Sequence, residues 1–173
     1  LRAVSYATHT QPWILVYLAD LQRVQTPKNE HARSLNAVVR ESRRDPKKLV
    51  YPAMTCPGML DIHADSGYRR MEQVDDDKGY GLRGLTLLRQ GVKPSHEKGT
   101  VVHLLGNECV DHKITVRSSY AAELLAGVHG VEDALPILIT LHELSKGPLP
   151  PHVMLSIRTN GQLRFRAILT TDA

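Results

Sequence analysis

Three acidic residues lie where the ends of predicted elements could bring carboxylates together. Asp65 ends a short alternating apolar stretch, Glu123 lies in the first turns of a predicted helix, and Asp172 ends a second alternating stretch. Carboxylates in one place repel each other unless a hard cation such as Mg²⁺ neutralises them. Two such ions about 3.5–4 Å apart stabilise the attacking and leaving oxygens of a phosphoryl displacement. These acids are therefore candidates for a two-metal site; the alternative is that they are ordinary surface acids.

A sheet is needed to position these acids, and the second part of the chain predicts one. Alternating or apolar runs predict four strands, over residues 59–65, 79–90, 100–105 and 163–172. Ser66-Gly67 is expected to break the first strand, and the first three strands to form an antiparallel meander. If the last strand returns parallel to the first, Asp65 and Asp172 end at the same sheet edge. Asp61 is a rival to Asp65 on the same strand face, but it lies further from the strand end.

A helix is predicted between the third and the last strand. Ser118 and Ser119 open it as capping residues, which explains these serines better than a nucleophilic role does. Its expected buried stripe consists of Leu124, Leu125, Val128, Val131 and Leu135. Pro136 is expected to kink or split the helix, and Gly147-Pro148 to stop it before a connection over 147–161. The predicted fold class is therefore α/β with a mixed sheet.

The first part of the chain predicts a basic helical hairpin. Apolar spacing indicates one helix over 10–25, and Thr26-Pro27 is expected to start a second that ends at Asp45-Pro46. Residues 1–50 contain 9 Lys/Arg and 4 Asp/Glu, which gives this segment a net charge of +5. The whole chain carries +4, so the remaining residues are nearly neutral, at −1. The basic residues of the second helix and its end are Arg33, Arg40, Arg43, Arg44, Lys47 and Lys48. This charge favours phosphate contact, with a solvated helix surface as the alternative.

Other signals exclude several classes of protein. No apolar run approaches the ~18 residues of a membrane span, and no signal-peptide core precedes the first helix, so we expect an intracellular protein, cytoplasmic or nuclear, that is not secreted. His103, Cys109 and His112 suggest a zinc site, but a fourth ligand is absent. Both ends of the chain are expected to be cut from something longer, since it starts at Leu1 and stops just after a strand-like run.

Several strings of the sequence match the pattern of one family. The strings are Gln11-Pro12-Trp13-Ile14, Leu21-Gln22-Arg23, Pro27, His31, His63-Ala64-Asp65-Ser66-Gly67, Lys78-Gly79-Tyr80-Gly81-Leu82, Ser118-Ser119-Tyr120-Ala121-Ala122-Glu123-Leu124 and Thr171-Asp172-Ala173. In this respect the chain resembles the end of a copia-type retrotransposon Pol polyprotein. The resemblance runs from the reverse-transcriptase connection, residues 1–50, into an incomplete ribonuclease H domain, residues 51–173.

The resemblance implies a ribonuclease H-like fold and a site. Asp65, Glu123 and Asp172 would be the catalytic, metal-binding carboxylates for two Mg²⁺ ions, with Mn²⁺ as a substitute. A fourth ligand and the final helix of the fold would lie beyond Ala173. Asp65 would bridge both ions, and a metal-activated water would attack a phosphodiester of the RNA strand.

The implied substrate is an RNA–DNA hybrid, which such an enzyme recognises through shape, phosphates and 2′-hydroxyls. The expected function is therefore that of a Mg²⁺-dependent endoribonuclease within a reverse-transcriptase polyprotein. Two alternatives remain open: a degenerate module that binds nucleic acid without cleaving it, and a structural polyprotein fragment with no separate activity.

Overall fold

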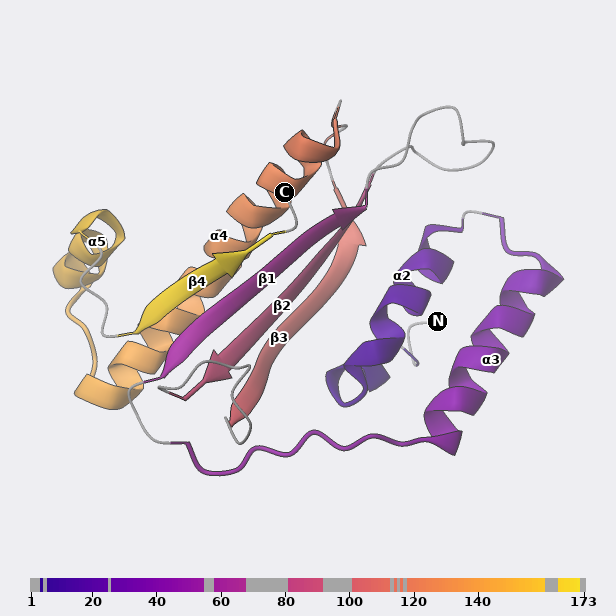
Figure 1. The fold of residues 1–173 in the computed structure, drawn as a ribbon, viewed down its shortest axis with the longest axis horizontal. Helices are drawn as coiled ribbons and strands as arrows, with labels where there is room; N and C mark the ends of the chain where they lie inside the picture. Colours follow the sequence, from indigo (N-terminus) through magenta and orange to yellow (C-terminus); the bar gives the residue numbers. More distant parts are fainter. Residues whose placement is uncertain are drawn as a thin grey trace.

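The chain folds as an α/β protein around a four-stranded open sheet with one helix across its back (Figure 1). The computed structural model describes residues 4, 6–24, 26–54, 58–67, 81–91, 101–112, 114, 116, 118–160 and 165–171. The strands are β1 (Met59–Gly67), β2 (Leu82–Gln90), β3 (Val102–Asp111) and β4 (Arg166–Thr170), in the order β3-β2-β1-β4. β1 is therefore a central strand, with partners on both sides.

The pairing of the strands confirms the predicted meander and the parallel return. β1 pairs antiparallel with β2, and β2 with β3, with an irregularity in register between Leu87 and Leu88. β4 pairs parallel with β1, from Met59 opposite Arg166 to His63 opposite Thr170. The strand boundaries differ from the prediction, because β1 continues through Ser66 and Gly67 and β3 is longer than expected. Ser66 stays in the strand because β2 pairs with it up to Gly67.

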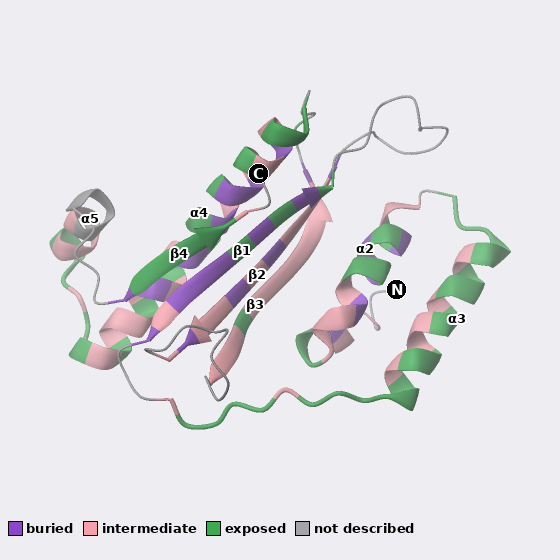
Figure 2. Cartoon of the chain, viewed as in Figure 1, coloured by how far each residue is buried: buried purple, intermediate pink, exposed green. Residues whose placement is uncertain are grey.

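The main core lies between the sheet and α4 (Ser119–Lys146). Leu60, Ile62 and Ala64 alternate along β1 on the face toward α4, and the odd-numbered side chains take the opposite face. Leu85 and Leu87 of β2 complete the sheet side of this core. Figure 2 shows the resulting contrast, with the buried centre of β1 beside the exposed β4.

The buried face of α4 is not the predicted one. Small residues contact the sheet, and the buried set is Ala122, Ala126, Gly127, Gly130, Ala134 and Leu138. Leu124, Val128 and Val131 of the predicted stripe are instead exposed. Small side chains let the helix backbone approach the sheet closely, and this places the larger apolar residues on the outer surface.

Pro136 does not split α4, which is one helix of 28 residues. The missing N–H removes one backbone hydrogen bond, but Ala134 and Leu138 on either side of it both remain buried against the sheet. Ser118 caps the helix as predicted, because its hydroxyl oxygen accepts a hydrogen bond from the Ala121 amide at 3.1 Å. Among the described residues, α4 is also long and apolar enough to cross a membrane. Core helices pass the same test of length and composition, so this property alone is weak evidence for a membrane span.

The connection predicted over 147–161 contains a further helix. α5 spans Pro151–Asn160 and begins with proline, whose missing N–H is not needed in the first turn. The proline at 151 therefore lies at the start of a helix, and the segment is not the irregular connection that its proline content predicted. Gly147 ends α4 as predicted, with a positive φ of 95°.

The helical hairpin lies beside β3, at the edge of the sheet away from β4 (Figure 1). Its Pro12 and Val16 line a cavity with His63 and Asp65, which belong to the face of β1 opposite α4. It consists of η1 (Tyr6–His9), η2 (Pro12–Ile14), α2 (Leu15–Arg23) and α3 (Asn29–Arg44). The second helix starts later than predicted, because the His31 ring accepts a hydrogen bond from the Lys28 amide at 2.9 Å and so caps it. Within α3 no residue is fully buried, so this helix is an exposed amphipathic element.

Two segments attach the first part of the chain to β3. Arg23 of α2 forms an ion pair with Asp111, with 2.9 Å between Nε and Oδ1. In the linker before β1, the Tyr51 hydroxyl donates to the Leu104 carbonyl at 2.8 Å. His103 forms a hydrogen bond of 2.7 Å with the Pro52 carbonyl. The hairpin and the sheet are therefore held together at both ends of β3.

Candidate functional site

Asp65 lines a cavity between the sheet and the start of the hairpin. The side chain is exposed and belongs to the face of β1 opposite α4. The cavity has a volume of about 540 Å³; His63, Asp65 and Thr170 line it from the β1–β4 pair, and Pro12 and Val16 from the hairpin. The acid is thus accessible to a ligand that enters from this face.

Glu123 reaches the end of β1 from α4. Its Oε1 accepts a hydrogen bond of 3.1 Å from the backbone amide of Ser66, the residue directly after Asp65. The side chain is half-buried, and Ser118 fixes the start of its helix. The structure therefore brings two of the predicted acids to the same strand end, although they are far apart in the sequence.

The third predicted acid, Asp172, lies outside the described residues. The described β1–β4 pairing ends with His63 opposite Thr170. Asp61, the rival to Asp65, shares its strand face but is buried, between Leu88 and Ile168 in the register. Asp61 is therefore less accessible to a ligand than Asp65.

The acids present fit a hard cation by their chemistry. Carboxylate oxygens are the ligands that Mg²⁺ prefers, and Asp65 and Glu123 supply them from adjoining elements. Among the residues that the structure describes, no group of three or more His, Cys, Asp or Glu side chains could hold a metal ion. The described part thus contains two carboxylates of the kind that Mg²⁺ prefers, with the Asp65 side chain on the face of β1 opposite α4 and Glu123 reaching the strand end from α4.

Ser66 and His112 form a buried pair that the sequence did not reveal as a unit. Ser66 Oγ lies 2.7 Å from His112 Nε2, and the His112 residue is only 1% exposed. Burial lowers the pKa of His112, and the positive charge of Arg83 lowers it further. Both effects favour the neutral form of the ring. The two residues are 46 positions apart, so no local spacing could have signalled the contact.

The residues considered for zinc have other partners. His103 binds the Pro52 carbonyl and packs edge-on against Tyr51, whereas His112 binds Ser66. Burial raises the pKa of the Cys109 thiol, and the neighbouring Asp111 carboxylate adds to this. A thiol whose pKa is raised is a poorer metal ligand, because metals bind the thiolate.

All the predicted nucleic-acid-binding residues of the hairpin are exposed. They are Arg33, Arg40, Arg43, Arg44, Lys47 and Lys48. Two have weak acidic neighbours, since Arg44 lies 4.0 Å from Glu41 and Lys47 lies 4.0 Å from Asp45. Exposed pairs of this kind contribute little and are screened by salt. The basic side of α3 is therefore available to a phosphate backbone.

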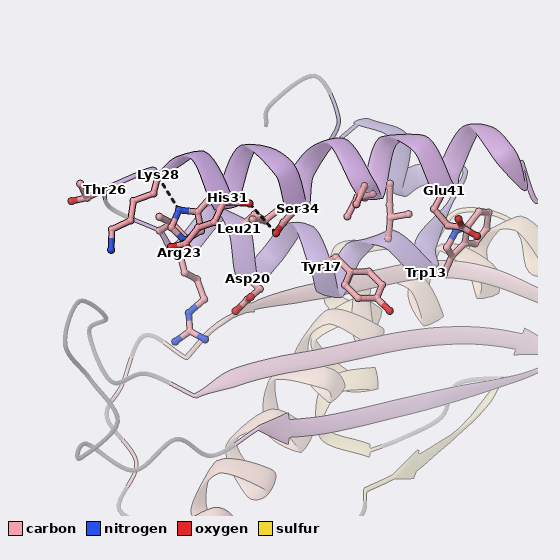
Figure 3. A pocket seen from close by; sticks show the side chains of 15 residues that line it. Trp13, Tyr17, Asp20, Leu21, Arg23, Thr26, Lys28, His31, Ser34 and Glu41 are labelled. Atoms are coloured by element: carbon pink, nitrogen blue, oxygen red, sulfur yellow. Dashed lines mark hydrogen bonds and ion pairs between the residues drawn. The ribbon is translucent and has the colours of Figure 1, made fainter.

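A second and larger cavity lies between α2 and α3 (Figure 3). Its volume is about 770 Å³, and Trp13, Tyr17 and Leu21 line it from the η2–α2 side. Figure 3 shows Arg23 pointing away from α3 toward the sheet, in line with its ion pair to Asp111. Acidic and basic residues both surround this cavity, so it shows no preference for an anionic ligand; the lining acids and bases are Asp20, Glu30, Glu41, Arg23, Lys28 and His31.

No protein-family model matches the chain, and no curated protein matches it, so a functional inference for this protein depends on its fold and its site.

Proposed function

We propose that this chain is a ribonuclease H-like domain of a retrotransposon polyprotein, preceded by a basic helical hairpin. The observation that carries the proposal is the hydrogen bond from the Ser66 amide to Glu123, because it joins the strand end that bears Asp65 to the helix that bears the second acid. The sheet order supports it, since β4 returns parallel to β1 and Asp172 follows this strand in the sequence.

The proposed reaction is hydrolysis of the RNA strand of an RNA–DNA hybrid. Bound Mg²⁺ ions would supply the activation of water and the stabilisation of charge on the leaving oxygen. Asp65 and Glu123 would hold the ions through their carboxylate oxygens, and the resemblance adds Asp172. The cavity beside Asp65 gives the scissile phosphate an entrance on the face opposite α4.

A metal-binding and cleavage assay tests the proposal. Mn²⁺ binding is measured on residues 1–173, and cleavage of a labelled RNA–DNA hybrid on a chain that also includes the fourth ligand that the resemblance places beyond Ala173. We expect Asp65→Asn to lower the cleavage rate by at least about 100-fold and to weaken Mn²⁺ binding, because it removes a charged ligand. Asp61→Asn is the matched control on the same strand face and should keep the activity if the chain still folds. Unchanged cleavage after Asp65→Asn would reject catalysis at this site.

A module that binds nucleic acid without cleaving it is the second candidate. The observation in its favour is the exposed basic side of α3, which is complete in the structure and does not depend on the acids. Salt-sensitive binding of the hybrid without cleavage in the assay above would favour this function. Absence of both binding and cleavage would favour a structural fragment of the polyprotein.

A further inference from the structure

The buried pair of Ser66 and His112 adjoins both candidate acids, because Ser66 follows Asp65 in β1 and its amide binds Glu123. Its hydrogen bond is short, with 2.7 Å between Oγ and Nε2. Both residues are more than nine-tenths buried, at 7% and 1% exposure. A buried polar side chain is costly unless a partner satisfies it, so each of these residues holds the other in place.

Ser66, which His112 holds in place, is linked to both acids. It follows Asp65 in the chain, and its amide donates to Glu123 Oε1 at 3.1 Å. Its hydroxyl also lies 3.4 Å from the Leu82 carbonyl oxygen. A hydroxyl has one proton to donate, so the arrangement that satisfies both contacts has Ser66 donating to Leu82 and accepting from the His112 Nε2–H. A shift of Ser66 would therefore move the amide that holds Glu123 and the backbone that carries Asp65.

His112 is itself anchored on both sides. Its amide donates to the Gly81 carbonyl at 2.9 Å, just before β2 begins. Asp111, the residue before it, forms the ion pair with Arg23 of the hairpin. The ring thus has a fixed backbone from which to hold the end of β1.

We propose that His112 is a positioning residue, which acts through Ser66 to fix Asp65 and Glu123 in the arrangement that binds a divalent cation. This inference rests on the proposed function, because it assumes that the two acids bind the cation. Residues that orient metal ligands from outside typically change metal affinity by about 10- to 100-fold when they are replaced.

Three variants of the chain of residues 1–173 separate positioning from simple stability. His112→Leu removes the ring nitrogens and keeps apolar volume, whereas His112→Gln keeps an amide that can reach Ser66 Oγ. Gln90→Leu is the matched control, because Gln90 is buried to a similar degree, at 2% exposure, but pairs with Met59 at the opposite end of β1. Ser66→Ala serves as an independent probe that keeps the backbone amide, should His112→Leu fail to fold.

The readouts are Mn²⁺ affinity, from the electron paramagnetic resonance signal of free Mn²⁺, and amide exchange of Ser66 without metal. We expect His112→Leu and Ser66→Ala to weaken Mn²⁺ binding by about 10- to 100-fold and to speed exchange of the Ser66 amide beyond the global change. His112→Gln should keep the Mn²⁺ affinity within about threefold of that of the unmodified chain. This change is much smaller than the loss expected when a residue that orients a metal ligand is removed. Gln90→Leu should alter stability only.

Two results would overturn the inference in different ways. If the unmodified chain binds Mn²⁺ and Asp65→Asn abolishes this, unchanged affinity in His112→Leu and Ser66→Ala rejects the positioning role alone. The same holds if Gln90→Leu loses as much affinity as His112→Leu. If the unmodified chain binds no Mn²⁺, or Asp65→Asn binds it equally well, the proposed site is rejected and this inference with it.

Discussion

Ser66 contributes its amide and its hydroxyl to different partners at the end of β1. The amide binds Glu123 and the hydroxyl binds His112, whereas the neighbouring Asp65 is exposed to the cavity. The alternation of a strand explains this division, because successive side chains point to opposite faces. One dipeptide thus joins a buried polar contact on one face to an accessible acid on the other.

The lowered pKa of His112 predicts a dependence of stability on pH. The unfolded chain binds a proton at this histidine near its ordinary pKa of about 6.5, but burial and Arg83 make protonation harder in the folded chain. Stability should therefore be lost as the pH falls through the unfolded value toward the lower folded value. Thermal unfolding between pH 7.5 and 5.5 measures this loss.

His112→Gln should reduce the slope of melting temperature against pH over the same interval, because glutamine does not titrate. The other histidines remain in both proteins, so the difference between the two slopes belongs to His112. Parallel slopes would mean that His112 titrates alike in the folded and unfolded chains.

Helix α4 is placed on the sheet by its small residues. A Cβ at Gly130 would lie 3.0 Å from Ile62 Cγ2 and 3.1 Å from Leu85 Cδ1, and both of these side chains are buried. A Cβ at Gly127 would meet Leu169 Cδ2 at 3.3 Å, but Leu169 is 43% exposed and can move. Two glycines about one turn apart therefore differ in how much space a methyl group would find.

This difference predicts opposite effects of the same substitution. Gly130→Ala should lower the free energy of unfolding by about 1 kcal/mol or more, because overpacking of a tight core outweighs the helix propensity of alanine. Gly127→Ala should raise it by up to about 1 kcal/mol, the gain expected from propensity alone. Urea unfolding of both variants tests the pair, and a stabilising Gly130→Ala would show that the α4–β1 contact is looser than the structure indicates.

Positive charge is concentrated in the hairpin, which lies away from Glu123 on α4 but lines the cavity beside Asp65. The hairpin contains the surplus of Lys and Arg and lies beside β3, whereas α4 with Glu123 packs behind β1 and β4 (Figure 1). The ion pair of Arg23 with Asp111 attaches the hairpin to β3. A duplex could therefore contact the hairpin through its phosphates while the cavity beside Asp65 faces the same side of the sheet.

Neutralising the basic side of α3 should weaken binding of an RNA–DNA hybrid. We expect the variant with Arg40, Arg43 and Arg44 changed to Gln to reduce the slope of log affinity against log salt by up to about 0.9 for each phosphate that the hairpin no longer neutralises. Fluorescence anisotropy at several salt concentrations measures this slope. Lys146→Gln with Arg166→Gln is the control, because both residues are exposed outside the hairpin; an equal reduction per charge there would show that only net charge matters.

Local patterns predicted much of the architecture. The alternation in residues 59–65, the capping serine at 118 and the crossover to the last strand led to the observed meander with a parallel β4. The same reasoning failed at α4, where apolar residues lie on two sides of one helix. Periodicity then cannot say which side meets the sheet, because contact distance favours the small residues.

The sequence by itself determined the order and type of most elements and the basic character of α3, because these depend on neighbours a few residues apart. Only the tertiary structure decided that Glu123 reaches the amide beside Asp65 and that His112 holds Ser66 from within the protein. These partners are separated by 57 and 46 residues. Their contact depends on how α4 and the residue that follows β3 are placed at the end of β1, which no spacing along the chain encodes.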